Sequence, residues 1–265
     1  MKLLALLMLL PLPALAQTGP GTMPAPELPP GLVSASLLAG WTTESGHRMT
    51  ALRLQLEPGW KTYWRSPGDA GVPPQFDWSG SQNLGTLTPR WPRPEAIESG
   101  GERSLGYHDA LLLPIEVAPA VPGQPVVLRA RVDFGLCDSI CVPARVELTA
   151  PPPSPDPDPA ILAALSREPR LDPDQPVCTI TQIADGMRVT ARFDKDAPEA
   201  AMELDDARIW VSQPELSRQD GQLLAQSDFI AESGKPFPLD PAQVRLTLIA
   251  PDHAVEYRGC RPTGG

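Results

Sequence analysis

Proline and glycine are spread along almost the whole of this chain, and they limit the structures that it can form. The 265 residues include 35 prolines and 21 glycines. Proline lacks a backbone N–H and clashes with the preceding turn of a helix, so such a chain favours short segments separated by turns. The sequence therefore predicts a mostly β protein with few long helices.

Strands are indicated by segments in which apolar and polar residues alternate, as a strand with one buried face requires. The alternation occurs at residues 52–57, 128–134, 145–148 and 187–193, and residues 209–211 and 244–249 are further candidates. Residues 111–117 are also apolar, but Pro114 interrupts them and suggests an edge strand or a bend. Short strands between turns favour the β-sandwich architecture.

A proline-rich run at residues 150–159 divides the chain. It offers few apolar side chains to bury and is stiffened toward polyproline II geometry, so it predicts a linker. We expect an all-β protein of two tandem immunoglobulin-like β-sandwich domains joined by this linker. The expected boundaries are a leader rich in Pro and Gly at 17–30, a first domain at 31–150, a linker at 151–170 with a short helix near 160–166, and a smaller second domain at 171–265.

The first 16 residues have the pattern of a secretory signal peptide. Lys2 is followed by an apolar stretch from Leu3 to Leu10 and by the small-x-small sequence Ala14-Leu15-Ala16. Export points to a soluble protein of the bacterial periplasm, because no later stretch approaches the length of a membrane span. The net charge of −10 argues against nucleic acid or an anionic membrane as a partner.

Cys137 and Cys141 lie close together in this exported chain, where thiols tend to be oxidised. Fully extended, the segment would separate their Cα atoms by roughly 13 Å. A disulfide needs about 4.4–6.8 Å, so Asp138-Ser139-Ile140 must turn at the end of a hairpin. A ring this small contributes only about 2 kcal/mol in the chain-entropy model. The pair is therefore either a redox-active dithiol or a structural bond at the hairpin end. A zinc site is disfavoured because no His or second Cys pair lies near in sequence, and a thioredoxin-type centre is disfavoured by the three-residue spacing and the all-β setting.

The other two cysteines, Cys178 and Cys260, lie near the start and the end of the expected second domain. Four cysteines allow three connectivities, which the sequence cannot distinguish. If each domain keeps its own pair, Cys178 bonds to Cys260 and closes a long loop. This bond is then interpreted as structural.

Three segments together carry a resemblance to a known family. They are Trp60-Lys-Thr-Tyr-Trp-Arg-Ser-Pro-Gly-Asp-Ala-Gly-Val-Pro-Pro74, Gly106-Tyr107, and the cysteine loop that ends in Val142-Pro143. In this order they resemble the N-terminal periplasmic domain of DsbD-type protein-disulfide reductases, and more closely the ScsB-like branch. The resemblance covers residues 31–150 well and the second domain more loosely.

The resemblance implies a periplasmic thiol:disulfide interchange protein without a cofactor or metal. Electrons would come from a membrane-embedded DsbD/ScsB/CcdA-like donor and pass to thioredoxin-fold or other disulfide-bearing clients. Cys141 would form the mixed disulfide with a partner and Cys137 would resolve it. A cap loop near residues 93–105 would shield the pair.

The surroundings of the cysteine loop are open to two interpretations. Trp64, Tyr107, His108 and Pro143 are candidates for the environment of the pair. However, Trp64 would equally fill the sandwich core, with Trp60 and Tyr63, and His108 would equally lie at the surface. Arg65 and Asp69 are close enough in sequence to pair across the Pro67-Gly68 turn and make that loop rigid.

Two other functions compete with disulfide exchange. A non-catalytic β-sandwich adaptor would use both disulfides structurally and bind a partner through its loops. A copper-handling protein is the other alternative, because the two thiolates suit copper(I). The methionines outside the expected signal are widely scattered and form no cluster in sequence.

Overall fold

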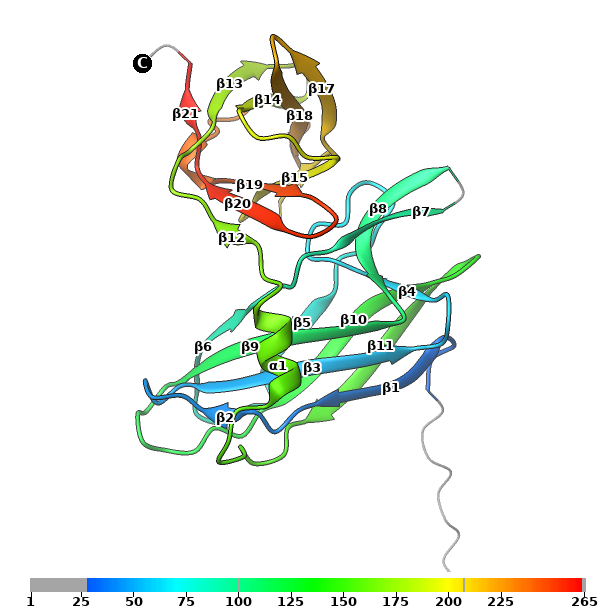
Figure 1. The fold of residues 1–265 in the computed structure, drawn as a ribbon, viewed down its shortest axis with the longest axis vertical. Coiled ribbons are helices and arrows are strands. Elements are labelled where there is room, and N and C mark those ends of the chain that lie inside the picture. The colour runs from blue at the N-terminus through cyan, green and yellow to red at the C-terminus, as the bar shows by residue number, and fades with distance from the viewer. Residues whose placement is uncertain (1–27, 100, 207, 264–265) are drawn as a thin grey trace, which may run out of the picture.

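The computed structural model describes residues 28–99, 101–206 and 208–263, and strands dominate this part of the chain (Figure 1). The expected signal peptide and most of the expected leader lie outside the described residues. The prediction of a mostly β protein is confirmed. The immunoglobulin-like class of each half and the domain boundaries remain predictions.

In the N-terminal half, the described strands form two sheets. The first has the order β1-β3-β9-β6, with β2 on β3, and the second has the order β11-β10-β4-β8-β7, with β5 on β10. The strands of the first are β1 (Leu32–Leu37), β2 (Trp41–Thr42), β3 (Arg48–Leu56), β6 (Leu84–Pro89) and β9 (Ala110–Pro119). Those of the second are β4 (Lys61–Tyr63), β5 (Gln75–Asp77), β7 (Glu95–Ser99), β8 (Glu102–His108), β10 (Arg129–Cys137) and β11 (Cys141–Thr149).

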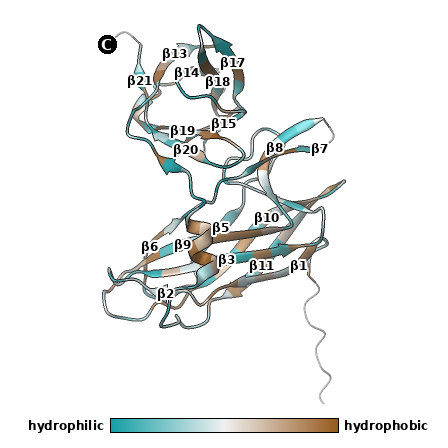
Figure 2. Ribbon diagram, viewed as in Figure 1, coloured by the Kyte–Doolittle hydropathy of each residue, from teal (hydrophilic) through white to brown (hydrophobic). Residues whose placement is uncertain are grey.

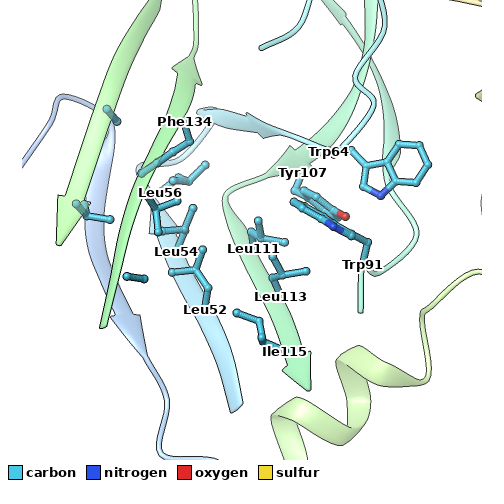
Figure 3. Close-up of a cluster of buried hydrophobic side chains, with 14 of the residues drawn as sticks. Leu52, Leu54, Leu56, Trp64, Trp91, Tyr107, Leu111, Leu113, Ile115 and Phe134 are labelled. Atoms are coloured by element: carbon cyan, nitrogen blue, oxygen red, sulfur yellow. The ribbon is translucent and has the colours of Figure 1, made fainter. Parts of the chain in front are cut away.

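Alternation in the sequence explains the core between these sheets. Leu52, Leu54 and Leu56 of β3 are buried and pack with residues from β9 and β10, as Figure 3 shows. The hydropathy colouring shows apolar and polar positions following one another along these strands (Figure 2). Burial of apolar area at about 25 cal/mol per Å² makes this cluster the main source of stability for the half.

Pro114 lies in an inner strand, so the expectation of an edge strand is wrong. β9 pairs with β3 on one side and with β6 on the other. The proline is tolerated because β6 ends beside it: Pro89 is the last β6 residue and pairs with Ile115. The Pro114 carbonyl still accepts a hydrogen bond from the Arg90 N–H.

The segment expected as a linker is anchored to the N-terminal half. The helix α1 (Pro159–Leu165) begins with Asp158, whose side chain accepts from the N–H groups of Ala160 and Ile161. Ile161 is fully buried in a small cluster with residues of β2 and β3. Ser154 also donates its backbone N–H to Gly40 O at 2.7 Å. The short helix is thus confirmed within one residue.

The C-terminal half also contains two sheets in the described residues. Their orders are β12-β20-β19-β15 and β16-β18-β14-β13-β21, with β17 on β18. The strands of the first are β12 (Arg170–Leu171), β15 (Glu199–Leu204), β19 (Val244–Ile249) and β20 (Ala254–Arg258). Those of the second are β13 (Val177–Gln182), β14 (Gly186–Phe193), β16 (Ile209–Val211), β17 (Glu215–Gln219), β18 (Gln222–Ala231) and β21 (Arg261–Pro262), and the 3₁₀-helix η1 (Pro241–Gln243) precedes β19.

A disulfide lies in the core of this second half. Cys178 in β13 and Cys260 before β21 are bonded, with their Cα atoms 5.7 Å apart. Both are buried among residues such as Val189, Phe229 and Tyr257. A buried bond between residues 82 positions apart is the arrangement that the structural interpretation requires.

The two halves meet through an ion cluster and apolar contacts. The Arg65 guanidinium reaches Glu203 at 2.9 Å and Glu256 at 2.7 Å, and all three side chains are largely buried. Arg65 also stacks 4.4 Å above the Trp64 ring. The suggested Arg65–Asp69 pair is therefore not formed: Asp69 instead accepts from the Gln213 N–H at 2.9 Å.

Candidate redox site

The cysteine pair closes the end of a regular hairpin. β10 and β11 pair in continuous antiparallel register from Arg129 and Thr149 to Cys137 and Cys141. Asp138, Ser139 and Ile140 make the turn, as the spacing predicted. The disulfide is present, and the two Cα atoms lie 4.1 Å apart. Both sulfurs are therefore held in place by the strand ladder as well as by their own bond.

The two cysteines differ sharply in their access to solvent. Cys137 is 0% exposed, whereas Cys141 is exposed at the start of the edge strand β11. The turn beside Cys141 is exposed too, including Ile140, which is 67% exposed. Because a thiolate must approach a disulfide sulfur directly, Cys141 is the sulfur that an outside thiol can reach.

Tyr63 of β4 lies against both sulfurs. Its hydroxyl oxygen is 2.9 Å from Cys137 Sγ and 3.4 Å from Cys141 Sγ. Disulfide sulfurs carry no proton, so the tyrosine hydroxyl is the donor. Burial, with a further contribution from the charge of Glu102, raises the pKa of Tyr63. The hydroxyl therefore keeps its proton at neutral pH and can stabilise a thiolate formed at Cys137.

A glycine makes room for this tyrosine. A Cβ atom at Gly135 would lie 3.0 Å from the Tyr63 ring, which is closer than side chains normally approach. The Tyr63 ring thus packs against Gly135 of β10, and its hydroxyl reaches Cys137. Tyr63 was expected to fill the core, so its contact with the disulfide is a role that the sequence did not indicate. Its position two residues after Lys61 on a short strand places both on the same face.

An apolar groove opens beside Cys141, with a volume of about 420 Å³. We call it the Cys141 groove; its walls include Tyr63, Val72, Pro73, Gly135, Cys141 and Pro143. Pro143 therefore lies beside the exposed sulfur, and the loop at residues 66–74 forms the opposite wall. Such a groove can accept an apolar side chain next to a sulfur that reacts at Cys141.

Lys61 and His108 continue the row that Cys137 begins. Lys61 pairs with Cys137 across β4 and β10, and His108 pairs with Lys61 across β8 and β4. Burial lowers the pKa of Lys61, and the charge of Asp138 opposes this shift. His108 is about half exposed and lies 3.3 Å from Glu95. Of these two residues, Lys61 directly neighbours Cys137 in the sheet, whereas His108 is one strand further away.

The structure places Trp64 and Tyr107 in the hydrophobic core (Figure 3). Trp64 is 0% exposed, and the Tyr107 hydroxyl donates to Pro92 O at 2.7 Å. Burial raises the pKa of Tyr107 well above its usual value. These two residues support the strands that carry the site, while Tyr63 and Pro143 border the cysteines.

The segment expected as a cap loop forms the β7–β8 hairpin instead. Glu98 pairs in register with Arg103, and Arg103 extends to Glu199 of the C-terminal half at 2.9 Å. Tyr63 makes the contact with the sulfurs. The described residues contain no cluster of three or more His, Cys, Asp or Glu side chains arranged to hold a metal ion.

These features define a class: a β-sheet domain with an asymmetrically exposed disulfide at the end of a hairpin. Residues 34–153 match the sequence profile of the family described as thiol:disulfide interchange protein DsbD, N-terminal. This part of the chain belongs to the DsbD N-terminal domain family. No curated protein matches the chain in sequence.

Two solved structures extend the comparison. The N-terminal periplasmic domain of ScsB from Proteus mirabilis is 21% identical, with a TM-score of 0.60 over 87% of this chain and 92% of that one. The fold similarity thus spans both halves. The N-terminal domain of DsbD from Neisseria meningitidis, in the reduced form, is 18% identical, covers 43% of this chain and 82% of that one, and has a TM-score of 0.29.

Proposed function

We propose that this protein exchanges electrons with other proteins through the Cys137–Cys141 pair. The observation that carries the proposal is the unequal exposure of the two sulfurs: Cys141 is exposed and Cys137 is fully buried beneath Tyr63. A disulfide with a purely structural role does not require one sulfur to be exposed and the other buried. The family of residues 34–153 supports the same function.

In the reducing direction, the Cys141 thiolate attacks one sulfur of a client disulfide. This step forms a mixed disulfide and releases the client's other thiolate. The Cys137 thiolate then attacks Cys141 Sγ, which releases the second client thiolate and forms the Cys137–Cys141 bond. Two electrons pass to the client, and its two thiolates take up protons from water.

The Cys137–Cys141 disulfide is then reduced again by a donor, in the reverse order of steps. A dithiol donor attacks the exposed Cys141 sulfur, and Cys137 leaves as a thiolate. A hydrogen bond from Tyr63 to that thiolate lowers the barrier, because a leaving thiol of lower pKa departs faster. The donor that we propose is a membrane-embedded reductase of the DsbD, ScsB or CcdA kind, and the clients are disulfide-bearing proteins.

We infer a periplasmic location, with two supporting observations. The sequence begins with a signal-peptide pattern, and the similar ScsB structure is described as a periplasmic domain. Among the described residues, no helix has the length and apolar character needed to cross a bilayer. Thiol–disulfide exchange with exported clients takes place in that compartment.

The reduction potential of the pair tests the proposal. The protein is equilibrated with redox buffers, and alkylated thiols are assigned to each pair by mass spectrometry. We expect a value between about −270 and −120 mV, the range of exchange-active dithiols. A value below about −300 mV would identify an ordinary structural bond and favour the adaptor function.

Matched single-cysteine variants test the unequal roles. Cys137→Ser leaves the exposed Cys141 thiol, and Cys141→Ser leaves the buried Cys137 thiol. Only the former should react rapidly with a small aromatic disulfide and accumulate a stable mixed disulfide. Equal rates in both variants would show that exposure does not select the attacking sulfur.

A further inference from the structure

A second cavity lies on the other side of the loop that borders the Cys141 groove. It has a volume of about 740 Å³ and is formed between that loop and strands β15, β16 and β18 of the C-terminal half. We call it the Trp210 cleft, because Trp210 of β16 lines it and is 54% exposed. Pro73 lines both cavities, so they adjoin across a single residue.

Exposed apolar side chains continue from one cavity to the other. Ile140 stands beside Cys141 and is 67% exposed, and Val72, at the wall of the groove, is 58% exposed. Trp210 follows beyond Pro73. A large tryptophan left open to solvent on an edge strand is uncommon, and tryptophan is enriched among the residues that dominate protein binding.

The relative position of the two cavities is fixed by contacts between the halves. Arg65, at the start of the loop, is held by Glu203 and Glu256. Asp69, in its middle, accepts from the Gln213 N–H at 2.9 Å. A binding surface that is already ordered loses less conformational entropy when a partner binds.

The charge of the Trp210 cleft points to the chemistry of the occupant. Five carboxylates and three arginines line the cleft. Of these, Glu203, Arg65 and Arg245 belong to the ion cluster between the two halves. Asp205 and Glu232 lie on exposed positions of its rim. An excess of carboxylates favours a basic side chain at this end of the surface.

We propose that the client-binding surface runs from the Cys141 groove across Pro73 into the Trp210 cleft, and that an extended client segment occupies it. Its cysteine bonds to Cys141, an apolar neighbour fills the groove, and a basic residue further along lies at the cleft against Trp210. The C-terminal half is then part of the client site. This inference rests on the proposed exchange function, because the sulfur that reacts at Cys141 determines which polypeptide lies there.

The test uses the full chain with Cys137→Ser, so that the first exchange step is isolated. The probe is a peptide of about thirteen residues whose central cysteine carries thionitrobenzoate; extended, it reaches about 20 Å to each side. Cys141 thiolate attacks the peptide sulfur and releases the thionitrobenzoate anion, whose absorbance gives the rate. The peptide has valine beside cysteine and lysines near its ends. A glycine–cysteine–glycine peptide is the short reference.

We expect the long peptide to react about tenfold faster than the short one, and Trp210→Ala to remove most of this gain, in line with the loss of an aromatic anchor. Replacing the lysines by glutamates should also slow the long peptide. Leu171→Ala, an equally exposed apolar residue of the same half, is the matched control and should change neither rate.

Two results would count against the inference in different ways. An unchanged advantage of the long peptide in Trp210→Ala would overturn the extended surface while leaving exchange at Cys141 intact. If even the short peptide failed to react with Cys141 in every variant, the exchange function itself would be wrong, and the surface with it.

Discussion

Arg65 and Glu203 are 138 positions apart in the sequence, yet the arginine donates to both carboxylate oxygens of the glutamate, at distances of 2.9–3.2 Å. Glu256 accepts from the same guanidinium at 2.7 Å. Burial lowers the pKa of Arg65, but the two carboxylates more than offset this, so the net shift is upward. The N-terminal half and the C-terminal half are therefore joined by a charged contact with little access to water.

Removing Arg65 should destabilise the protein strongly. Arg65→Ala leaves Glu203 and Glu256 buried without their main cation, and breaking such a cluster costs about 3 kcal/mol or more. Urea unfolding followed by tryptophan fluorescence measures the loss. Arg218→Ala is the control, because Arg218 and Asp196 are both about two-thirds exposed and solvent screening leaves their ion pair with little effect on stability. Equal effects of the two substitutions would show that burial does not strengthen the Arg65 cluster.

The same cluster should make stability depend on pH in the acid range. Burial raises the pKa of Glu256, but Arg65 outweighs this and holds it below 4.5, its usual value. A group with a depressed pKa stabilises the fold above its unfolded value and loses that contribution as pH falls through the folded one. The contribution of Glu256 is thus complete near neutral pH and lost below about 4.5.

The variant Glu256→Gln isolates this effect. Its free energy of unfolding should be lower than that of the parent at pH 7, and the difference should shrink below pH 4. Unfolding curves at intervals of half a pH unit measure it. The pKa of Glu199 is shifted in the opposite direction, upward, because burial raises it more than Arg103 lowers it. A difference between parent and variant that stays constant with pH would contradict the assignment to Glu256.

Tyr63→Phe should slow the exchange reaction while preserving the fold. The substitution keeps the ring over Gly135 and removes the hydroxyl that lies 2.9 Å from Cys137 Sγ. A hydrogen bond to a charged group contributes about 1.5–3 kcal/mol, so we expect reduction of the disulfide by a dithiol to be about tenfold slower or more. The pKa of Cys137 in the reduced protein should rise, as ultraviolet absorbance of the thiolate would report. An unchanged rate and thiol pKa would exclude Tyr63 from stabilising the leaving sulfur.

The two disulfides should contribute unequally to stability. Replacing Cys178 and Cys260 by serine opens a loop of 82 positions and should cost about 4.5 kcal/mol. Replacing Cys137 and Cys141 should cost about 2 kcal/mol, since the ring is small and β10–β11 pairing remains. Thermal unfolding of both double variants compares them. Removal of the Cys178–Cys260 bond should also leave the reduction potential of the Cys137–Cys141 pair unchanged. A shift in that potential would reveal coupling between the halves.

Much of the local structure follows from the sequence because it depends on nearest neighbours. The alternation at residues 52–57 and 128–134 gave β3 and β10, and the spacing of Cys137 and Cys141 gave the hairpin turn. The short helix was equally visible, since Asp158 and Pro159 form a start signal for it.

The remaining features depend on contacts between distant residues. Nothing near Arg65 in the sequence indicates Glu203 or Glu256 as partners, and a turn of four residues made Asp69 the natural expectation. The expectation that Pro114 lies in an edge strand failed for a similar reason. Whether an inner strand can accept a proline depends on where the neighbouring strand, here β6, ends. The contact of Tyr63 with the disulfide could not be predicted, because the glycine that leaves room for its ring, Gly135, lies on another strand, 72 positions later.

The ladder between β10 and β11 determines what happens to the thiols when the disulfide opens. Register pairs continue to the cysteines themselves, so the strands keep the two sulfurs adjacent in the reduced protein. Each sulfur then meets the other at an effective concentration that a dissolved thiol cannot match. For the exchange function that we propose, we therefore expect a mixed disulfide at Cys141 to be short-lived in the intact protein, because the client leaves by intramolecular displacement before a second molecule arrives.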